Sequence, residues 1–175
     1  MLRMTVEGVG FDHHKNTVVV LKDWENKKLL PIWIGAAEAR SIALHLEGTA
    51  MPRPLSHDLM LSCIGAGGGR VTRVVINDLQ EGTYYATIDV DTPNGVLHVD
   101  SRPSDAIALA VRAECPVFVD GAVLNELIDI TPDEDATTQG AESGGNGVKP
   151  EAQQSSKFSD DELDRFRRLV GDLDL

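Results

Sequence analysis

Two short segments of the chain place charged residues and a histidine where a helix is expected to begin. The first segment contains Arg53, His57 and Asp58, and the second contains Arg102 and Asp105. A histidine beside a carboxylate can transfer protons or bind a metal ion, and the unpaired backbone N–H groups of a helix start can hold an anion such as a phosphate. The alternative is two ordinary capped helix starts whose polar side chains face water.

Two acidic residues in a predicted turn, Asp78 and Glu81, form a second kind of candidate site. Paired carboxylates can bind Mg²⁺ or Mn²⁺, because these cations prefer oxygen ligands, and the bound cation can then position a phosphate. Acidic residues are also common in hairpin turns for turn geometry and solubility alone. The residues themselves leave both interpretations open.

The elements that must position these residues are predicted to form two similar units, each a strand hairpin followed by a helix. Alternating apolar residues and turn-forming residues predict the first unit over 18–46 and the second over 84–113. The tripeptide Ile-Ala-Leu at 42–44 recurs at 107–109, within the helix of each unit. This pattern predicts an α+β domain with a mainly antiparallel sheet and a duplicated strand–strand–helix unit.

Serine side chains are expected to cap the two helices that carry the candidate residues. Ser56 has the position of an N-cap in the first helix, and Ser101 or Ser104 in the second. Residues 77–82 are expected to form a turn, and residues 122–128 a short helix.

The composition divides the chain into three parts. We expect a folded domain over residues 1–130 and a flexible acidic linker over 131–157, because that stretch is nearly free of large apolar side chains. Residues 158–175 are expected to form an amphipathic helix and tail, since Ser159 and Glu162 have the spacing of a capping box.

The formal net charge of the chain is −12, and residues 129–175 hold 12 acidic but only 5 basic residues. General electrostatics therefore favour weak binding of nucleic acid, because that affinity comes from Lys and Arg. Cys63 and Cys115 are expected to be reduced, buried thiols of a cytoplasmic protein. No apolar run is long enough to span a bilayer, so no membrane partner is expected.

Four segments occur in an order that resembles a known family: residues 31–39, 53–59, 78–86 and 101–109. Together they resemble the bifunctional nuclease domain family, in its bacterial branch, over about residues 4–130. The resemblance implies a barrel-like sheet core with surrounding helices, association into homo-oligomers, and hydrolysis of phosphodiester bonds in both DNA and RNA.

The resemblance also implies a set of site residues, which are the polar residues at the motif positions: Arg53, His57, Asp58, Asp78, Glu81, Arg102 and Asp105. Acids of this set would hold Mg²⁺ or Mn²⁺, an arginine would hold the scissile phosphate, and His57 would transfer the proton. The acidic composition supports a competing hypothesis, a non-catalytic regulatory module that binds a small ligand or another protein.

Overall fold

The computed structural model describes residues 1–12, 14–25 and 27–130. The chain divides into two units, residues 1–129 and residues 130–175. The predicted linker at 131–157 and the predicted helical tail at 158–175 lie outside the described residues. Within the described residues, no helix has the length and apolar character needed to cross a membrane.

Eight strands form one mostly antiparallel sheet. They are β1 (Leu2–Phe11), β2 (Thr17–Asp23), β3 (Lys28–Trp33), β4 (Arg70–Gln80), β5 (Thr83–Thr92), β6 (Gly95–Ser101), β7 (Val117–Val119) and β8 (Ile128–Asp129). Their order in the sheet is β6-β5-β4-β7-β1-β2-β3-β8. The short strand β7 pairs with β1 and β4, and so joins two antiparallel three-stranded meanders, β1–β2–β3 and β4–β5–β6.

The described residues form three α-helices, α1 (Ala36–Leu46), α2 (Ser56–Ala66) and α3 (Pro103–Ala113), and a 3₁₀ helix, η1, over Gly121–Glu126. The helix α1 follows the first meander and α3 follows the second. This arrangement confirms the α+β class and the mainly antiparallel sheet. The duplication of the unit stays a prediction. The sheet is open, with β6 and β8 as its edges, so the barrel-like closure is not found among the described strands.

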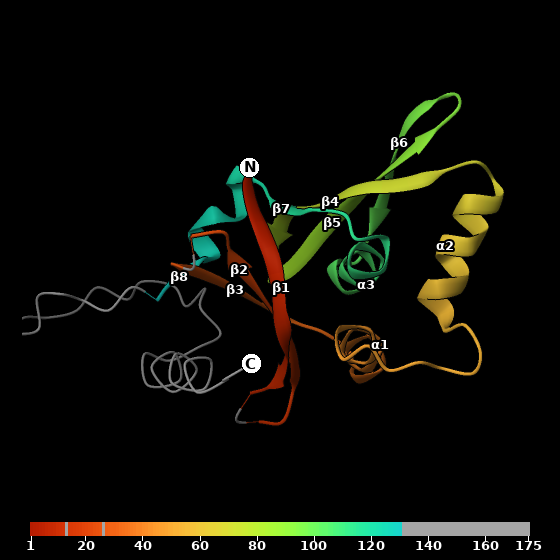
Figure 1. Ribbon diagram of the computed structural model, residues 1–175. Helices are drawn as coiled ribbons and strands as arrows, with labels where there is room; N and C mark the ends of the chain where they lie inside the picture. Colours follow the sequence, from red (N-terminus) through yellow and green to blue (C-terminus); the bar gives the residue numbers. More distant parts are fainter. Residues whose placement is uncertain (13, 26, 131–175) are drawn as a thin grey trace, which may run out of the picture. The chain divides into compact units, whose positions relative to one another are not determined.

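The helix α3 is at the centre of the domain, packed against α1, α2, β4 and β5 (Figure 1). Seven of its eleven residues are buried, whereas α2 buries only His57. Its middle turns carry Ala106, Ala108 and Ala110, each at most 1% exposed. Small side chains allow neighbouring helices to approach closely, which lets short polar side chains reach from one helix to another.

The serines predicted as helix caps are not at the N-cap positions, which Leu55 and Arg102 occupy. At the start of α2, the Asp58 carboxylate accepts the Leu55 backbone N–H at 2.7 Å and so replaces a serine cap. At the start of α3, Pro103 has no N–H to satisfy, so a side-chain cap is less needed. The predictions for Ser56, Ser101 and Ser104 were therefore wrong.

Three further local predictions were wrong. The strand β4 continues to Gln80, and the turn contains only Glu81 and Gly82, whose φ angles are 50° and 76°. A two-residue turn with both φ angles positive matches the twist of antiparallel strands, which explains why the hairpin continues so far. Residues 121–126 form a 3₁₀ helix, and the last residue of the predicted helix, Ile128, pairs with β3 as part of β8. Cys63 is exposed rather than buried.

Candidate active site

Four charged or ionisable side chains from three helices form a continuous chain of hydrogen bonds. His57 on α2 is 6% exposed, and its Nε2 atom lies 3.1 Å from Oδ1 of Asp105 on α3. The other oxygen of Asp105 accepts from Nε of Arg102 at 2.7 Å. Nη2 of Arg102 donates to Oε1 of Glu38 on α1 at 2.9 Å. The fold thus brings together three of the residues at motif positions: His57, Arg102 and Asp105.

The chain of bonds continues on the other side of the His57 ring. Oγ of Ser41 on α1 lies 3.0 Å from Nδ1 of His57. Arg112 of α3, whose side chain is 4% exposed, donates from Nη2 to the Ser41 hydroxyl at 3.0 Å and to the Ser41 carbonyl at 2.9 Å. Its Nε donates to Oδ1 of Asp58 at 2.6 Å. Asp58 is therefore linked to His57 indirectly, through Arg112 and Ser41.

We call these seven residues the helix network: Glu38, Ser41, His57, Asp58, Arg102, Asp105 and Arg112. Because Arg112 donates to the Ser41 hydroxyl, the hydroxyl hydrogen is available for Nδ1 of His57. This assigns the proton of a neutral His57 to Nε2, from which it is donated to Asp105. With neutral His57, three carboxylates and two guanidinium groups give the helix network a net charge of −1.

Two carboxylates of the helix network, Asp105 and Asp58, are held in the charged form. Burial raises the pKa of Asp105, but hydrogen bonds from Arg102 and His57 outweigh burial and hold that pKa below its ordinary value. Burial likewise raises the pKa of Asp58, and the Leu55 N–H and Arg112 lower it further than burial raises it. Hydrogen bonding to Asp105 raises the pKa of Arg102.

Among the residues described, solvent reaches the helix network at Arg102 and also at Asp58, whose side chain is 38% exposed. The Arg102 side chain is 66% exposed and that of Asp105 is 24% exposed, whereas the His57 side chain is 7% exposed. A molecule bound at the Arg102 end would therefore meet Arg102 first, then Asp105, with His57 behind Asp105. The buried position of His57 rules out the alternative of a first helical turn facing water.

Three members of the helix network were not predicted from the sequence: Glu38, Ser41 and Arg112. The spacing of seven residues between Asp105 and Arg112 is two helical turns, which places both on one face of α3. That spacing was a usable signal for Arg112. Ser41 and Glu38 lie on a different helix, and no spacing within one element connects them to His57.

The other predicted residues are not joined to the helix network. Arg53 is exposed in the loop before α2 and has no hydrogen bond to any network member among the described residues. Asp78 bonds within its own segment, where Oδ1 accepts the Leu79 N–H at 2.8 Å and Oδ2 accepts from Gln80 Nε2 at 2.6 Å. Glu81 is exposed in the two-residue turn.

These acids do not by themselves make a suitable cation site. Residues 1–130, as far as they are described, contain no group of three or more His, Cys, Asp or Glu side chains placed to hold a metal ion. Next to Asp78, Oδ1 of Asn77 is buried without a hydrogen-bond partner in the described part, which supplies one further oxygen. Both Asp78 oxygens, however, are already used. The binding of Mg²⁺ or Mn²⁺ by Asp78 and Glu81 stays a prediction.

A second group with the same residue types lies on the sheet, and we call it the sheet cluster: Arg73 of β4, Asp89 of β5 and His98 of β6. Nδ1 of His98 lies 2.7 Å from Oδ1 of Asp89, and Nε of Arg73 donates to Oδ2. Asp89 is 4% exposed. Burial raises its pKa, but the hydrogen bonds from His98 and Arg73 hold it below the ordinary value.

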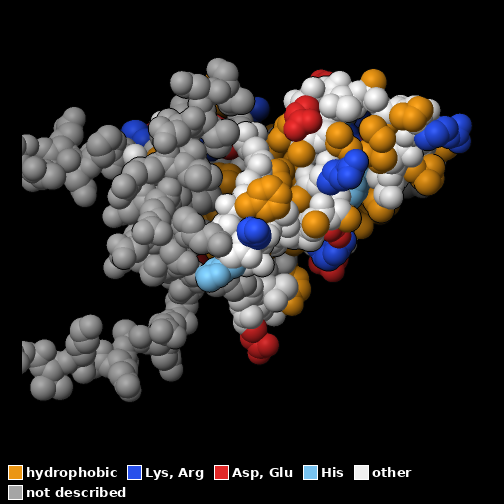
Figure 2. Space-filling view, turned by 90° about the horizontal axis from the view of Figure 1, so that it is seen from below, with side chains coloured by type: hydrophobic (Ala, Val, Ile, Leu, Met, Phe, Trp, Pro, Cys, Tyr) orange, Lys and Arg blue, Asp and Glu red, His pale blue; other side chains and the backbone are white. Residues whose placement is uncertain are grey.

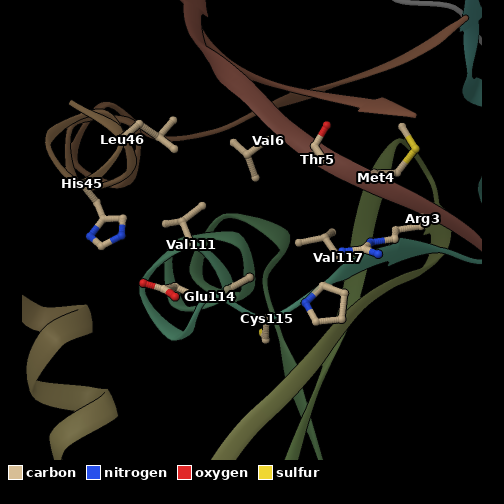
Figure 3. Close-up of a pocket in the computed structure, with 12 residues that line it drawn as sticks. Arg3, Met4, Thr5, Val6, His45, Leu46, Val111, Glu114, Cys115 and Val117 are labelled. Atoms are coloured by element: carbon tan, nitrogen blue, oxygen red, sulfur yellow. The ribbon is translucent and has the colours of Figure 1, made fainter. Parts of the chain in front are cut away.

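A cavity of about 450 Å³ lies apart from both groups, where the ends of α1 and α3 meet β1 and β7 (Figure 3). Val6, Leu46 and Val117 give it apolar walls, and His45 and Glu114 lie at its rim. It contains no predicted site residue. Burial raises the pKa of the Cys115 thiol in its lining, which makes that thiol less reactive.

The fold and the helix network define an α+β domain whose polar residues converge between three helices. The model of the bifunctional nuclease domain family matches residues 19–129, and the chain therefore belongs to this family. Two uncharacterized proteins, from two strains of Mycobacterium tuberculosis, are each 42% identical to the chain over 142 residues. The match covers 79% of this chain and 85% of each relative.

Proposed function

We propose that this protein is a cytoplasmic nuclease that hydrolyses phosphodiester bonds in DNA and RNA, and that the reaction takes place at the Arg102 end of the helix network. Membership of the bifunctional nuclease domain family supports a nuclease-like role. The observation that supports the location is the 3.1 Å contact between His57 and Asp105, next to an arginine whose side chain is 66% exposed.

Arg102 would bind the phosphate of the nucleic acid. Its guanidinium group holds two carboxylates, those of Glu38 and Asp105, and phosphate oxygens accept hydrogen bonds in the same paired geometry. A phosphate that replaces Asp105 on Arg102 would remove the largest of the hydrogen bonds that lower the pKa of Asp105. Asp105 would then be a stronger base at the moment when the substrate is bound.

Asp105 would accept the proton, and His57 would hold Asp105 in position. When a water molecule attacks phosphorus, a new P–O bond forms, the bond to the leaving oxygen breaks, and the water loses a proton. Asp105 lies between solvent and His57, so its carboxylate would accept this proton, while the Nε2–H of His57 stays hydrogen-bonded to it and holds it in position. The leaving oxygen would take a proton from solvent. No step requires the Asp78 and Glu81 carboxylates, whose role is tested with added metal.

One observation favours a second candidate function, a non-catalytic module that binds a small ligand or a protein. Each charged side chain of the helix network already has a partner within the protein, and the network carries a net charge of −1. Such a network can simply connect three helices. A module of this kind would gain thermal stability from its ligand and would cleave nothing.

The test is cleavage of labelled single-stranded RNA and DNA by the full chain, with Mg²⁺, with Mn²⁺ and with a chelator. We expect Arg102→Ala and Asp105→Asn to lower the cleavage rate at least about tenfold. Arg73→Ala is the matched control, because it also removes an exposed arginine bonded to an aspartate, and its rate should stay within about twofold.

Two outcomes would contradict the proposal in different ways. If the unmodified chain forms no products under any of these conditions, it is not a nuclease. If all variants cleave as fast as the unmodified chain, the reaction takes place elsewhere. Metal dependence that disappears in Asp78→Asn but not in Asp105→Asn would assign the cation to β4.

A further inference from the structure

The cavity between the ends of α1 and α3 carries charged groups that the protein itself does not use. Arg3 lies at one end of the cavity lining, and Glu114 lies toward the other end (Figure 3). Among the described residues, neither side chain takes part in a hydrogen bond or an ion pair, and the Arg3 guanidinium only stacks over the Trp24 ring, 5.7 Å from its centroid. Every charged side chain of the helix network, by contrast, has a partner. The charges at the cavity are therefore available to another molecule.

Glu114 occupies a position where a glutamate costs stability. It is the C-cap of α3 and has a φ angle of 52°, in the left-handed region that residues with a Cβ atom rarely adopt. Its carboxylate also lies at the negative end of the α3 dipole, where a positive charge would be favoured. The last residue of α1, Leu46, lines the same cavity, so the negative ends of two helices meet there. This end of the cavity therefore favours a cationic group such as an ammonium.

The strand β1 has an unpaired side at the cavity. The short strand β7 pairs with β1 only from Leu2 to Met4. The next two residues of β1, Thr5 and Val6, line the cavity, and no described strand pairs with them on that side. Successive residues of a strand direct their backbone N–H and C=O groups to opposite sides, so one of these two residues offers both groups to the cavity. An extended backbone of another chain can pair there, in line with β7.

The size of the cavity and its walls define the rest of the ligand. The volume of about 450 Å³ suits a drug-sized molecule and is larger than an inorganic ion or a single small amino acid needs. From Arg3 to Val6 the lining follows β1 for three residue steps, about 10 Å. The walls between are apolar and include Leu46, Val111 and Val117. A ligand that fits has an apolar body, an anionic group at the Arg3 end and a cationic group at the opposite end.

We propose that this cavity binds a short apolar peptide with free ends, extended alongside β1 and antiparallel to it. In that orientation, which is also that of β7, the C-terminal carboxylate of the peptide lies at Arg3 and its N-terminal ammonium lies toward Glu114. Three residues of an extended chain span about 10 Å, the length of the lining. The peptide backbone pairs with β1, its side chains contact the apolar walls, and both terminal charges are matched. This inference does not depend on the proposed nuclease activity.

A peptide fits this cavity better than a nucleic acid does. The lining contains one arginine, no lysine and no Phe, Tyr or Trp, whereas nucleic acids are bound by several basic side chains and by aromatic rings that stack on the bases. Figure 2 shows Lys and Arg side chains scattered singly over the face that it draws, without a continuous basic surface among the described residues there. A single arginine beside an apolar wall suits one carboxylate.

Calorimetric titration of the full chain with three peptides is the first test: trileucine, N-acetyl-trileucine and trileucine amide. We expect trileucine to bind, and each capped form to bind at least about tenfold more weakly, because each cap removes one terminal charge. A chain that binds no trileucine at millimolar concentration, or that binds the capped forms equally well, overturns the proposal.

Substitutions in the cavity locate the two ends of the peptide. In Arg3→Gln the amide should bind as well as trileucine, because the carboxylate has lost its partner, and in Glu114→Gln the acetyl form should do so. Both variants should bind trileucine at least about tenfold more weakly. Arg70→Gln is the matched control, since Arg70 is also an exposed arginine at the start of a strand and lies outside the cavity, and its affinity should stay within about twofold. Unchanged discrimination between the three peptides in Arg3→Gln and Glu114→Gln overturns the proposal.

Replacement of Glu114 by glycine separates binding from stability. Glu114→Gly removes the left-handed strain and the charge at the end of α3, so it should raise the Tm of the free chain by about 2–5 °C and weaken trileucine binding at least about tenfold. Lys15→Gly is the matched control, because Lys15 has a φ angle of 62° and lies outside the cavity, and it should raise the Tm without changing the affinity. A fall in the Tm of Glu114→Gly would show that Glu114 stabilises the fold itself, and unchanged binding would show that it does not hold the peptide. Either result overturns the proposal.

Hydrogen exchange of the unmodified chain tests the pairing with β1 and needs no substitution. Saturation with trileucine should slow the exchange of whichever amide, that of Thr5 or that of Val6, faces the cavity. The amide of Gly10, in the same strand but outside the cavity, should exchange at an unchanged rate. Exchange at Thr5 and Val6 that saturation leaves unchanged overturns the proposal.

Discussion

The helix network and the sheet cluster both contain a histidine, an aspartate and an arginine, but they bury opposite partners. In the helix network the His57 side chain is 7% exposed and that of Asp105 is 24% exposed. In the sheet cluster the Asp89 side chain is 6% exposed and that of His98 is 64% exposed. The same three residue types therefore have different roles in the two groups. The role depends on whether the histidine or the aspartate is the buried partner.

A buried carboxylate must be compensated by charge, so Arg73 and His98 are sufficiently explained as partners of Asp89. A buried histidine can remain neutral and needs only hydrogen-bond partners, which Ser41 and Asp105 provide. The helix network thus holds its histidine by hydrogen bonds alone, beside an arginine whose side chain is 66% exposed. For this reason we place the proposed chemistry there rather than on the sheet.

The largest effect on stability is expected when Arg112 is replaced, because this buried arginine has no equivalent in the sheet cluster. Arg112→Met keeps most of the side-chain volume but removes hydrogen bonds to Asp58, Ser41 and the Ala108 carbonyl. We expect a loss of about 3 kcal/mol in the free energy of unfolding, because buried polar partners are left unpaired. Urea denaturation followed by circular dichroism measures it. A loss below about 1 kcal/mol would mean that water replaces the guanidinium.

The two histidines give the next comparison. His57→Ala leaves a cavity between three helices and removes a partner from both Ser41 and Asp105. It should lower the free energy of unfolding by about 2 kcal/mol. His98→Ala leaves Asp89 with Arg73, so its effect should be below about 1 kcal/mol. Equal losses in the two variants would show that burial of the histidine does not separate the two groups.

The smallest expected effect is on the pH dependence of the free energy of unfolding. The pKa values of Asp89 and Asp105 are both below the ordinary 3.8 in the folded state, so the unfolded chain binds more protons at acidic pH. Their stabilisation is complete above about pH 4 and is lost as pH falls through the folded pKa values. Asp89→Asn and Asp105→Asn should each flatten this acid loss, measured as urea midpoints against pH.

Salt distinguishes the two aspartates in the same experiment. Ion pairs that water reaches are screened more strongly than buried ones. The contribution of Asp105, whose partner Arg102 is 66% exposed, should therefore shrink at about 1 M NaCl, while that of Asp89 should persist. The opposite order would contradict the comparison of the two environments.

The sequence was a good guide to the strands and a partial guide to the site. Alternating apolar residues predicted the hairpin β5–β6 and the start of α3, because those features are local. The open sheet could not be predicted, since closure depends on how β7 joins the two meanders. His57 and Asp105 were found at motif positions, whereas Ser41 looks like an ordinary helix residue until α1 is placed against α2.

The prediction for Asp78 shows the same limit. Its spacing from Glu81 suggested a shared turn, but β4 extends through Asp78, and the β-bulge between Ile76 and Asp78 changes which way the side chains point. A spacing of three residues has different consequences in a strand and in a turn. Only the three-dimensional structure decides between them.

The residues of the helix network come from segments that are far apart along the chain. Ser41 follows the first meander, Arg102 and Arg112 follow the second, and His57 lies between them. The helix network therefore cannot form in a chain that ends before α3. Any activity of the helix network would require α1, α2 and α3 to be packed together. A measurement of that activity would therefore also report that these three helices have assembled.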